Sequence, residues 1–163
     1  MKKRAIFEEI ETKRRSKFGR IIVFTGARQT GKTTIARHNF NDYTYLAVDD
    51  VVKSRNFINL TAEQWAQIYP QAVLDEIQCE PQLVHSIKAT YDQFSNTRYV
   101  LLGSSQFLLL EKVRESLAER CEILEIYPLT LPEMMTKSFE DTIETSFFVK
   151  YTKNQQSTDN IRL

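Results

Sequence analysis

The string GARQTGKT at residues 26–33 constrains this chain more than any other feature of its sequence. It matches the pattern G-x-x-x-x-G-K-[ST] in full, and it lies between an apolar run at residues 21–24 and a run that favours a helix to about residue 40. The glycines allow the backbone to turn so that successive N–H groups point inward, at the positive end of the helix dipole. The sequence therefore predicts a phosphate-binding loop between a buried strand and a helix.

Positions within this loop have separate predicted tasks. Lys32 is expected to reach the β and γ phosphates of a nucleoside triphosphate, and Thr33 to bind Mg²⁺ through its hydroxyl. Thr34 is placed to touch the α phosphate, while Arg28 and Gln29 contact either phosphate or solvent. Because neither an NKxD nor a DxxG string occurs, GTP is disfavoured and the predicted cofactors are ATP and Mg²⁺. The predicted nucleotide-binding residues are Gly26, Ala27, Arg28, Gln29, Thr30, Gly31, Lys32, Thr33 and Thr34.

Apolar runs alternate with helical patterns along the rest of the chain. Strands are expected at residues 21–24, 43–48, 72–74, 99–102 and 123–126, and helices at 3–15, 32–40, 61–69, 81–91 and 107–118. This alternation implies βαβ crossovers, because tight hairpins cannot join parallel neighbours. The predicted fold class is α/β, a three-layer sandwich around a mostly parallel five-stranded sheet. Its ligand is expected at the carboxyl ends of the strands.

Two of the expected strands end in pairs of acids, Asp49-Asp50 and Asp75-Glu76. Either pair could supply the aspartate that holds the water shell of Mg²⁺, and the first pair would suit a phosphotransferase. Asp75-Glu76 is favoured, because hydrolysis needs both a metal partner and a group that activates water, and adjacent acids can divide those tasks. Asp75 is expected to face the metal and Glu76 the attacking water. The other pair is interpreted as a turn or a helix cap.

The chain divides into three expected parts. Residues 1–18 form a basic helix, residues 19–137 the nucleotide-binding core, and residues 138–163 a polar tail that could begin a second domain. Residues 1–20 hold eight cations and three anions, a pattern typical of a solvated helix surface and also of a contact with nucleic acid or a protein partner. No run approaches the roughly 18 apolar residues that a membrane helix needs, and no signal peptide is evident. A cytoplasmic protein without a membrane contact is therefore expected.

Five strings occur in a fixed order: FTGARQTGKTT, AVLDEIQ, LLGSSQFLLL, ESLAER and IYPLTLPEM. Together, over residues 5–135, they resemble a family of bacterial and archaeal AAA-type ATPases whose core precedes a C-terminal domain of often nuclease-like character. The resemblance implies a sheet of RecA and AAA type, in which the acid-bearing third strand lies beside the strand of the phosphate loop. It also implies a polar sensor near the γ phosphate, at Ser104 or Ser105, after the fourth strand.

The same resemblance makes Arg120 a candidate arginine finger, which would act on the nucleotide of another subunit in a homo-oligomer. A plain cation at a helix C-terminus is the alternative for this residue. The chain has Glu119 where the family usually has glycine, Ala27 where proline is frequent, and Leu102 where threonine is common. Family members continue into a second domain, whereas this chain ends 29 residues after Met134, so a fragment or a shortened relative is expected.

The leading hypothesis is an Mg²⁺-dependent ATPase. Lys32 and the loop amides would hold the phosphates, and Glu76 would activate water. The predicted metal ligands are Thr33 and Asp75, and the predicted catalytic residues are Lys32, Glu76, Ser104, Ser105 and Arg120. One alternative is an ATP-controlled binding module with little turnover that engages DNA or a protein. A weaker alternative is a phosphotransferase that uses Asp49 or Asp50.

Overall fold

The computed structural model describes residues 1–16, 19–104 and 115–143 of the chain. These residues form two compact units, one of residues 8–128 and one of residues 1–7 together with residues from 129 onward. The larger unit contains the central sheet and the loop at residues 26–33. Each unit is described by itself.

A five-stranded sheet with the strand order β2-β3-β4-β1-β5 forms the centre of the larger unit. Each pair of neighbouring strands is parallel, as the alternation of strands and helices predicts. The expected α/β fold class is therefore confirmed. The strands are β1 (Ile21–Thr25), β2 (Thr44–Ala47), β3 (Gln71–Asp75), β4 (Arg98–Leu102) and β5 (Glu122–Glu125).

One expectation about this sheet is wrong. The acid-bearing strand β3 does not lie beside β1, because β4 separates the two strands. Strand β4 pairs through Val100 with Ile22 of β1 and also with Val73 of β3. The chain passes through helix α5 (Gln82–Gln93) after β3 and returns to fill the place between β3 and β1. Asp75 is thus two strands away from the strand that leads into the loop.

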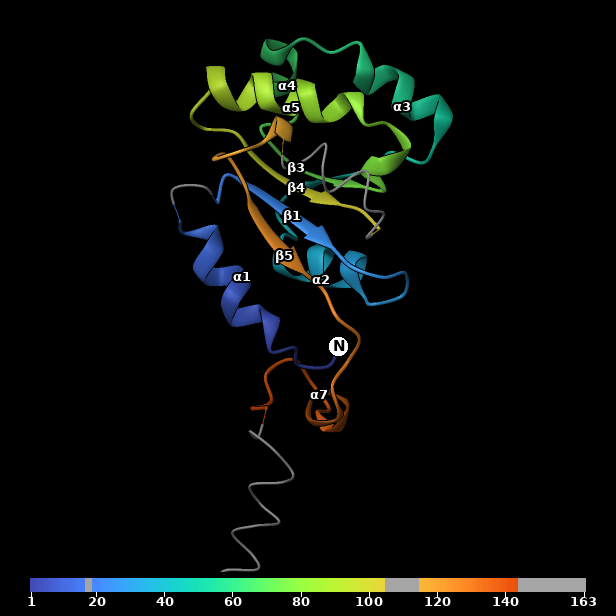
Figure 1. Ribbon diagram of the computed structural model, residues 1–163, viewed down its shortest axis with the longest axis vertical. Helices are drawn as coiled ribbons and strands as arrows, with labels where there is room; N and C mark the ends of the chain where they lie inside the picture. The colour runs from blue at the N-terminus through green and yellow to red at the C-terminus, as the bar shows by residue number, and fades with distance from the viewer. Residues whose placement is uncertain (17–18, 105–114, 144–163) are drawn as a thin grey trace, which may run out of the picture. The chain divides into compact units, whose positions relative to one another are not determined.

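Helices cover both faces of this sheet (Figure 1). Helices α3 (Val51–Ile58), α4 (Ala62–Ile68) and α5 lie together on one face, and α2 (Lys32–Asn39) lies on the other. All residues of β1 and the last four residues of β3 and β4 are buried, which is the burial expected for parallel strands covered on both sides. The other described helices before β4 are α1 (Ile6–Arg14), most of which belongs to this unit, and the 3₁₀ helix η1 (Ile77–Cys79).

The expected N-terminus of α4 is confirmed in detail. The backbone N–H of Gln64 donates to Thr61 Oγ1 at 3.2 Å, and the backbone N–H of Thr61 donates to Gln64 Oε1 at 2.9 Å. Helices α3 and η1 were not expected from periodicity. Helix α3 begins with two β-branched valines, which are weak helix formers, and it gains its support from packing against α5. Most of the helix expected at residues 107–118 lies outside the described residues.

An aromatic cluster joins the helices of one face to the sheet. The Trp65 side chain of α4 is 0 % exposed, and its ring centroid lies 6.1 Å from that of Tyr99 on β4. Tyr69 and Phe57 complete the cluster, with ring centroids 5.4 Å and 6.2 Å from that of Trp65. This packing fixes α4 and the end of α3 over the centre of the sheet.

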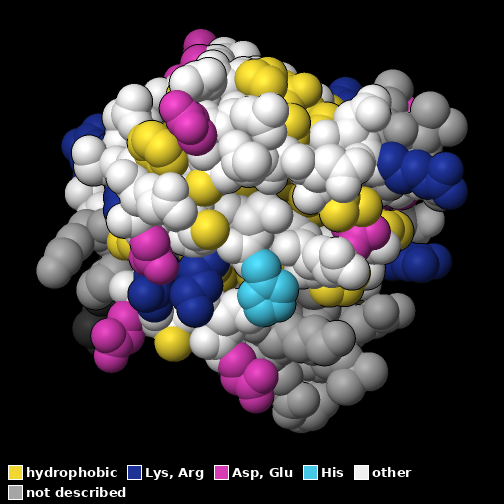
Figure 2. Space-filling model, turned by 90° about the horizontal axis from the view of Figure 1, so that it is seen from above, with side chains coloured by type: hydrophobic (Ala, Val, Ile, Leu, Met, Phe, Trp, Pro, Cys, Tyr) yellow, Lys and Arg dark blue, Asp and Glu magenta, His cyan; other side chains and the backbone are white. Residues whose placement is uncertain are grey.

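Ion pairs engage part of the basic N-terminal segment. Lys13 Nζ lies 3.0 Å from Glu122 Oε2, and Arg14 Nη2 lies 3.3 Å from Asp42 Oδ2. On the face of the molecule shown in Figure 2, acidic and basic side chains are interspersed. A contact of the basic segment with nucleic acid or a partner protein stays a prediction. Among the described helices, none is both long enough and apolar enough to cross a bilayer.

The smaller unit is organised by a buried carboxylate. Helix α7 (Leu131–Met135) carries Glu133, whose Oε2 accepts from the backbone N–H of Thr130 at 2.7 Å. Its Oε1 accepts from the backbone N–H of Ala5 at 2.8 Å and from Arg4 Nε at 3.3 Å. These bonds lower the pKa of Glu133 against the opposing effect of its burial. The acid of the IYPLTLPEM string is therefore a structural group that ties residues 4–5 to α7.

Replacing Trp65 with alanine is expected to lower the free energy of unfolding by about 3–5 kcal/mol, because it removes a fully buried aromatic side chain. The matched control is Ile68→Ala on the same helix, where the side chain is 54 % exposed and the expected loss is under about 0.5 kcal/mol. Urea denaturation measures both. Equal losses for the two variants would contradict the placement of Trp65 in the core.

Candidate functional site

The loop at residues 26–33 contains backbone conformations that residues with a side chain rarely adopt. Gly26 has φ 140° and Gly31 has φ 89°, in the left-handed region that favours glycine. A Cβ atom on Gly26 would lie 2.2 Å from the carbonyl oxygen of Ile126, at the end of β5. Gln29 adopts φ 64° without being glycine, and Thr30 Oγ1 donates to the Ala27 carbonyl at 3.0 Å. The loop is thus held tightly between β1, β5 and the N-terminus of α2.

Lys32 lies across this loop. Its Nζ donates to the carbonyl oxygens of Gly26 at 3.0 Å and Ala27 at 2.7 Å. Burial lowers the pKa of the Lys32 ammonium, and the carboxylates of Glu76 and Asp75 oppose that effect. The ammonium therefore interacts with the loop and with the acids at the end of β3.

Asp75 connects the sheet to the helix that follows the loop. Its Oδ2 accepts from Thr33 Oγ1 at 2.8 Å, and its Oδ1 accepts from the backbone N–H of Glu76 at 3.0 Å. The residue is only 8 % exposed. The structure therefore brings together the two residues that the sequence analysis assigned to Mg²⁺.

Tyr45 on β2 also contacts this carboxylate, which the sequence analysis missed. Its hydroxyl donates to Asp75 Oδ2. Burial is the larger cause, and this hydrogen bond the next, of an increase in the pKa of Tyr45 to about 12. The hydroxyl is therefore protonated at neutral pH. The register of the sheet could have predicted this contact. It pairs Ala47 with Asp75, and so places Tyr45 diagonally across from the acid. That register follows only once β2 is known to lie beside β3.

Glu76 follows Asp75 with φ 57°, and its side chain is exposed. Its carboxylate accepts from the side-chain amide of Gln78, a second contact that the sequence analysis missed. The oxygen of the same amide accepts from the backbone N–H of Ser104 at 3.4 Å. Gln78 thereby bridges the acid after β3 and the segment after β4. Ser104 Oγ is buried and has no hydrogen-bond partner among the described residues.

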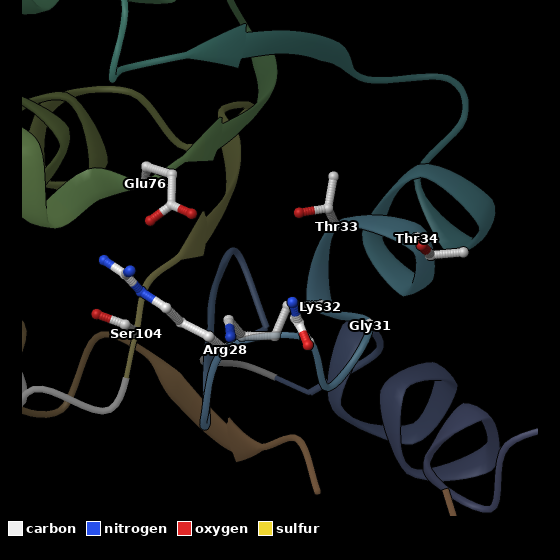
Figure 3. A pocket seen from close by; sticks show the side chains of 8 residues that line it. Arg28, Gly31, Lys32, Thr33, Thr34, Glu76 and Ser104 are labelled. Carbon is white, nitrogen blue, oxygen red and sulfur yellow. The ribbon is translucent and has the colours of Figure 1, made fainter. Parts of the chain in front are cut away.

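A cavity of about 540 Å³ lies at the carboxyl ends of the strands (Figure 3). Arg28 extends from the loop toward Glu76 and Ser104, and the Thr33 hydroxyl points to the side on which Glu76 lies. The lining residues are Arg28, Gln29, Gly31, Lys32, Thr33, Thr34, Glu76 and Ser104. The cavity therefore gathers loop residues, an acid from the end of β3 and a serine from the end of β4.

Other predicted residues lie elsewhere. Asp49 and Asp50 follow β2 and precede α3, and neither lines this cavity. The Arg120 side chain does not line this cavity either. Its Nε donates to Asp92 Oδ1 at 2.8 Å. Glu119 has φ 61°, in the left-handed region that favours glycine. Ser105 lies outside the described residues.

The residues of the cavity fit a polyphosphate with a divalent cation. Mg²⁺ usually takes one or two protein oxygens and completes its shell with phosphate and water, and Thr33 and Asp75 offer such a pair. Over the described part of the chain, no cluster of three or more His, Cys, Asp or Glu side chains could hold a metal by itself. The unpartnered Ser104 hydroxyl and the Lys32 ammonium are further groups suited to an anionic ligand.

Replacing Gly26 with alanine is expected to lower the free energy of unfolding by at least about 1–3 kcal/mol, because the new methyl group meets the Ile126 carbonyl at a strained φ. The exposed neighbour Ala27 provides the control, and Ala27→Ser is expected to change stability by less than about 0.5 kcal/mol. Both values come from urea denaturation. A Gly26→Ala variant as stable as the wild type would show that the loop does not need this close approach.

Comparison with curated proteins finds no match for the chain. A family model described as AAA domain matches residues 19–135, a stretch that contains the sheet, the phosphate loop and each residue lining the cavity. The match covers well over half of the sequence. The chain therefore belongs to the AAA domain family.

Proposed function

We propose that this chain binds ATP with Mg²⁺ and hydrolyses it. AAA domains are ATPase-like nucleotide-binding domains, and the cavity provides the groups that such a reaction needs. The observation that carries the proposal is the convergence of Lys32, Thr33 and Glu76 on one cavity, with Asp75 bonded to Thr33. Phosphoryl transfer depends mostly on positioning and on stabilisation of charge, which these groups can supply.

Phosphate binding would use the loop and the start of α2. Successive backbone N–H groups after Gly26 and the positive end of the helix dipole attract the polyphosphate. The Lys32 ammonium would exchange its bonds to the Gly26 and Ala27 carbonyls for bonds to phosphate oxygens. Thr33 and Asp75 would hold Mg²⁺, which neutralises charge on the phosphate oxygens when it is bound.

Hydrolysis would use Glu76 as the group that orients and deprotonates water. The water oxygen forms a bond to the γ phosphorus, the bond to the leaving oxygen of ADP breaks, and the water proton passes to the Glu76 carboxylate. Glu76 holds the Gln78 amide in this structure, so it must share or release that bond to reach water. Ser104 would donate its free hydroxyl to the γ phosphate.

Two arginines could stabilise the charge that develops on the γ phosphate. Arg28 already lines the cavity and extends toward Glu76, so it can act within the same chain. Arg120 is paired with Asp92 and would have to exchange that partner to act on another subunit. Turnover by the isolated chain is therefore expected to be slow if the second arginine is required.

Replacing Lys32 with alanine is expected to weaken ATP binding by at least about tenfold, because a charge-assisted bond to phosphate is worth about 1.5–3 kcal/mol. The thermal shift produced by Mg·ATP measures this loss. Lys88→Ala on α5 is the control, since Lys88 does not line the cavity. If the Lys32→Ala variant bound Mg·ATP as tightly as the wild type, Lys32 would not contact the phosphates.

Replacing Glu76 with glutamine is expected to leave ATP bound while phosphate release falls about 100-fold or more, the usual contribution of a general base. Asp49→Asn is the matched control and is expected to release phosphate at the wild-type rate. Normal turnover by Glu76→Gln combined with its loss in Asp49→Asn would support the phosphotransferase alternative. Following the γ phosphate to water or to an acceptor separates the two reactions.

A further inference from the structure

The Asp75 carboxylate accepts hydrogen bonds from three directions. Its Oδ2 accepts from both Thr33 and Tyr45, and its Oδ1 accepts from the backbone N–H of Glu76. An ionised carboxylate has about four lone-pair positions, two on each oxygen. Oδ2 is therefore fully used, and one position on Oδ1 remains for a further ligand.

Tyr45 is itself held in place by helix α2. The guanidinium carbon of Arg37 lies 4.0 Å from the centroid of the Tyr45 ring, close enough for a cation–π interaction. Arg37 follows Thr33 by four residues, so both side chains lie on one face of α2. The helix that follows the phosphate loop thus reaches Asp75 twice, directly through Thr33 and indirectly through Arg37 and Tyr45.

We propose that Tyr45, oriented by Arg37, is a positioning residue for Asp75 and sets how tightly the site holds Mg²⁺ with ATP. This inference rests on the proposed function. The Tyr45 hydroxyl occupies a position on Oδ2 and restricts rotation of the carboxylate, so Asp75 keeps the orientation in which it bonds to Thr33, the other proposed Mg²⁺ ligand. Groups that hydrogen-bond to ligating carboxylates commonly contribute 10–100-fold, in order of magnitude, to metal affinity.

The test uses Tyr45→Phe, which removes the hydroxyl and keeps the ring over which Arg37 packs. Thermal stabilisation by ATP is recorded while Mg²⁺ is titrated, and the Mg²⁺ concentration at half effect is compared. This midpoint is expected to rise by about tenfold or more in Tyr45→Phe. The stabilisation by ATP without Mg²⁺ is expected to stay unchanged, which a merely structural role of Tyr45 would not produce.

Tyr43→Phe is the matched control. Tyr43 lies two residues away and lines, with Tyr45 and Arg37, a second cavity of about 370 Å³. It makes no described contact with Asp75, so its variant is expected to keep the wild-type midpoint. Arg37→Ala is expected to raise the midpoint in the same direction by a smaller factor, since the hydroxyl remains.

A double substitution separates the effect of the Tyr45–Asp75 hydrogen bond from a general loss of stability in the Tyr45 variant. In an Asp75→Asn background the hydroxyl has lost its charged partner, so adding Tyr45→Phe is expected to change the midpoint little. A wild type that Mg·ATP does not stabilise would overturn the proposed function itself. A wild type that Mg·ATP stabilises, with a Tyr45→Phe midpoint equal to that of wild type, would overturn only the role of Tyr45.

Discussion

The hydrogen bond between Thr33 and Asp75 joins the two halves of the site. Thr33 lies in the first turn of α2, and Asp75 ends a strand that lies two places away from β1 in the sheet. Because the strands are parallel, their carboxyl ends meet at one edge, and a threonine from one crossover can reach an acid from another. This contact connects the loop at residues 26–33 with the acids at the end of β3.

Contacts within the chain occupy several of the groups that the reaction would use. Lys32 donates hydrogen bonds to loop carbonyls, Glu76 accepts one from Gln78, and Arg120 donates one to Asp92. Under the proposed function, nucleotide binding would exchange these contacts for bonds to phosphate and water.

Local sequence was enough to predict the turn between β1 and α2, the strands that precede Glu76 and Ser104, and the capped start of α4. Those features depend on neighbouring residues, such as the glycines at 26 and 31 or the pairing of Thr61 with Gln64. Strand order was not predictable in the same way, because no local pattern shows that β4 separates β3 from β1. Tyr45 and Gln78 were missed for the same reason, since their contacts depend on which elements are neighbours in space.

The cavity beside Lys32 is proposed to be a nucleotide site that works with Mg²⁺. Isothermal titration calorimetry of the wild-type chain with ATP, in the presence and absence of Mg²⁺, measures this property. We expect saturable binding of one nucleotide per chain that tightens when Mg²⁺ is present. The absence of saturable heat at millimolar Mg·ATP would contradict it.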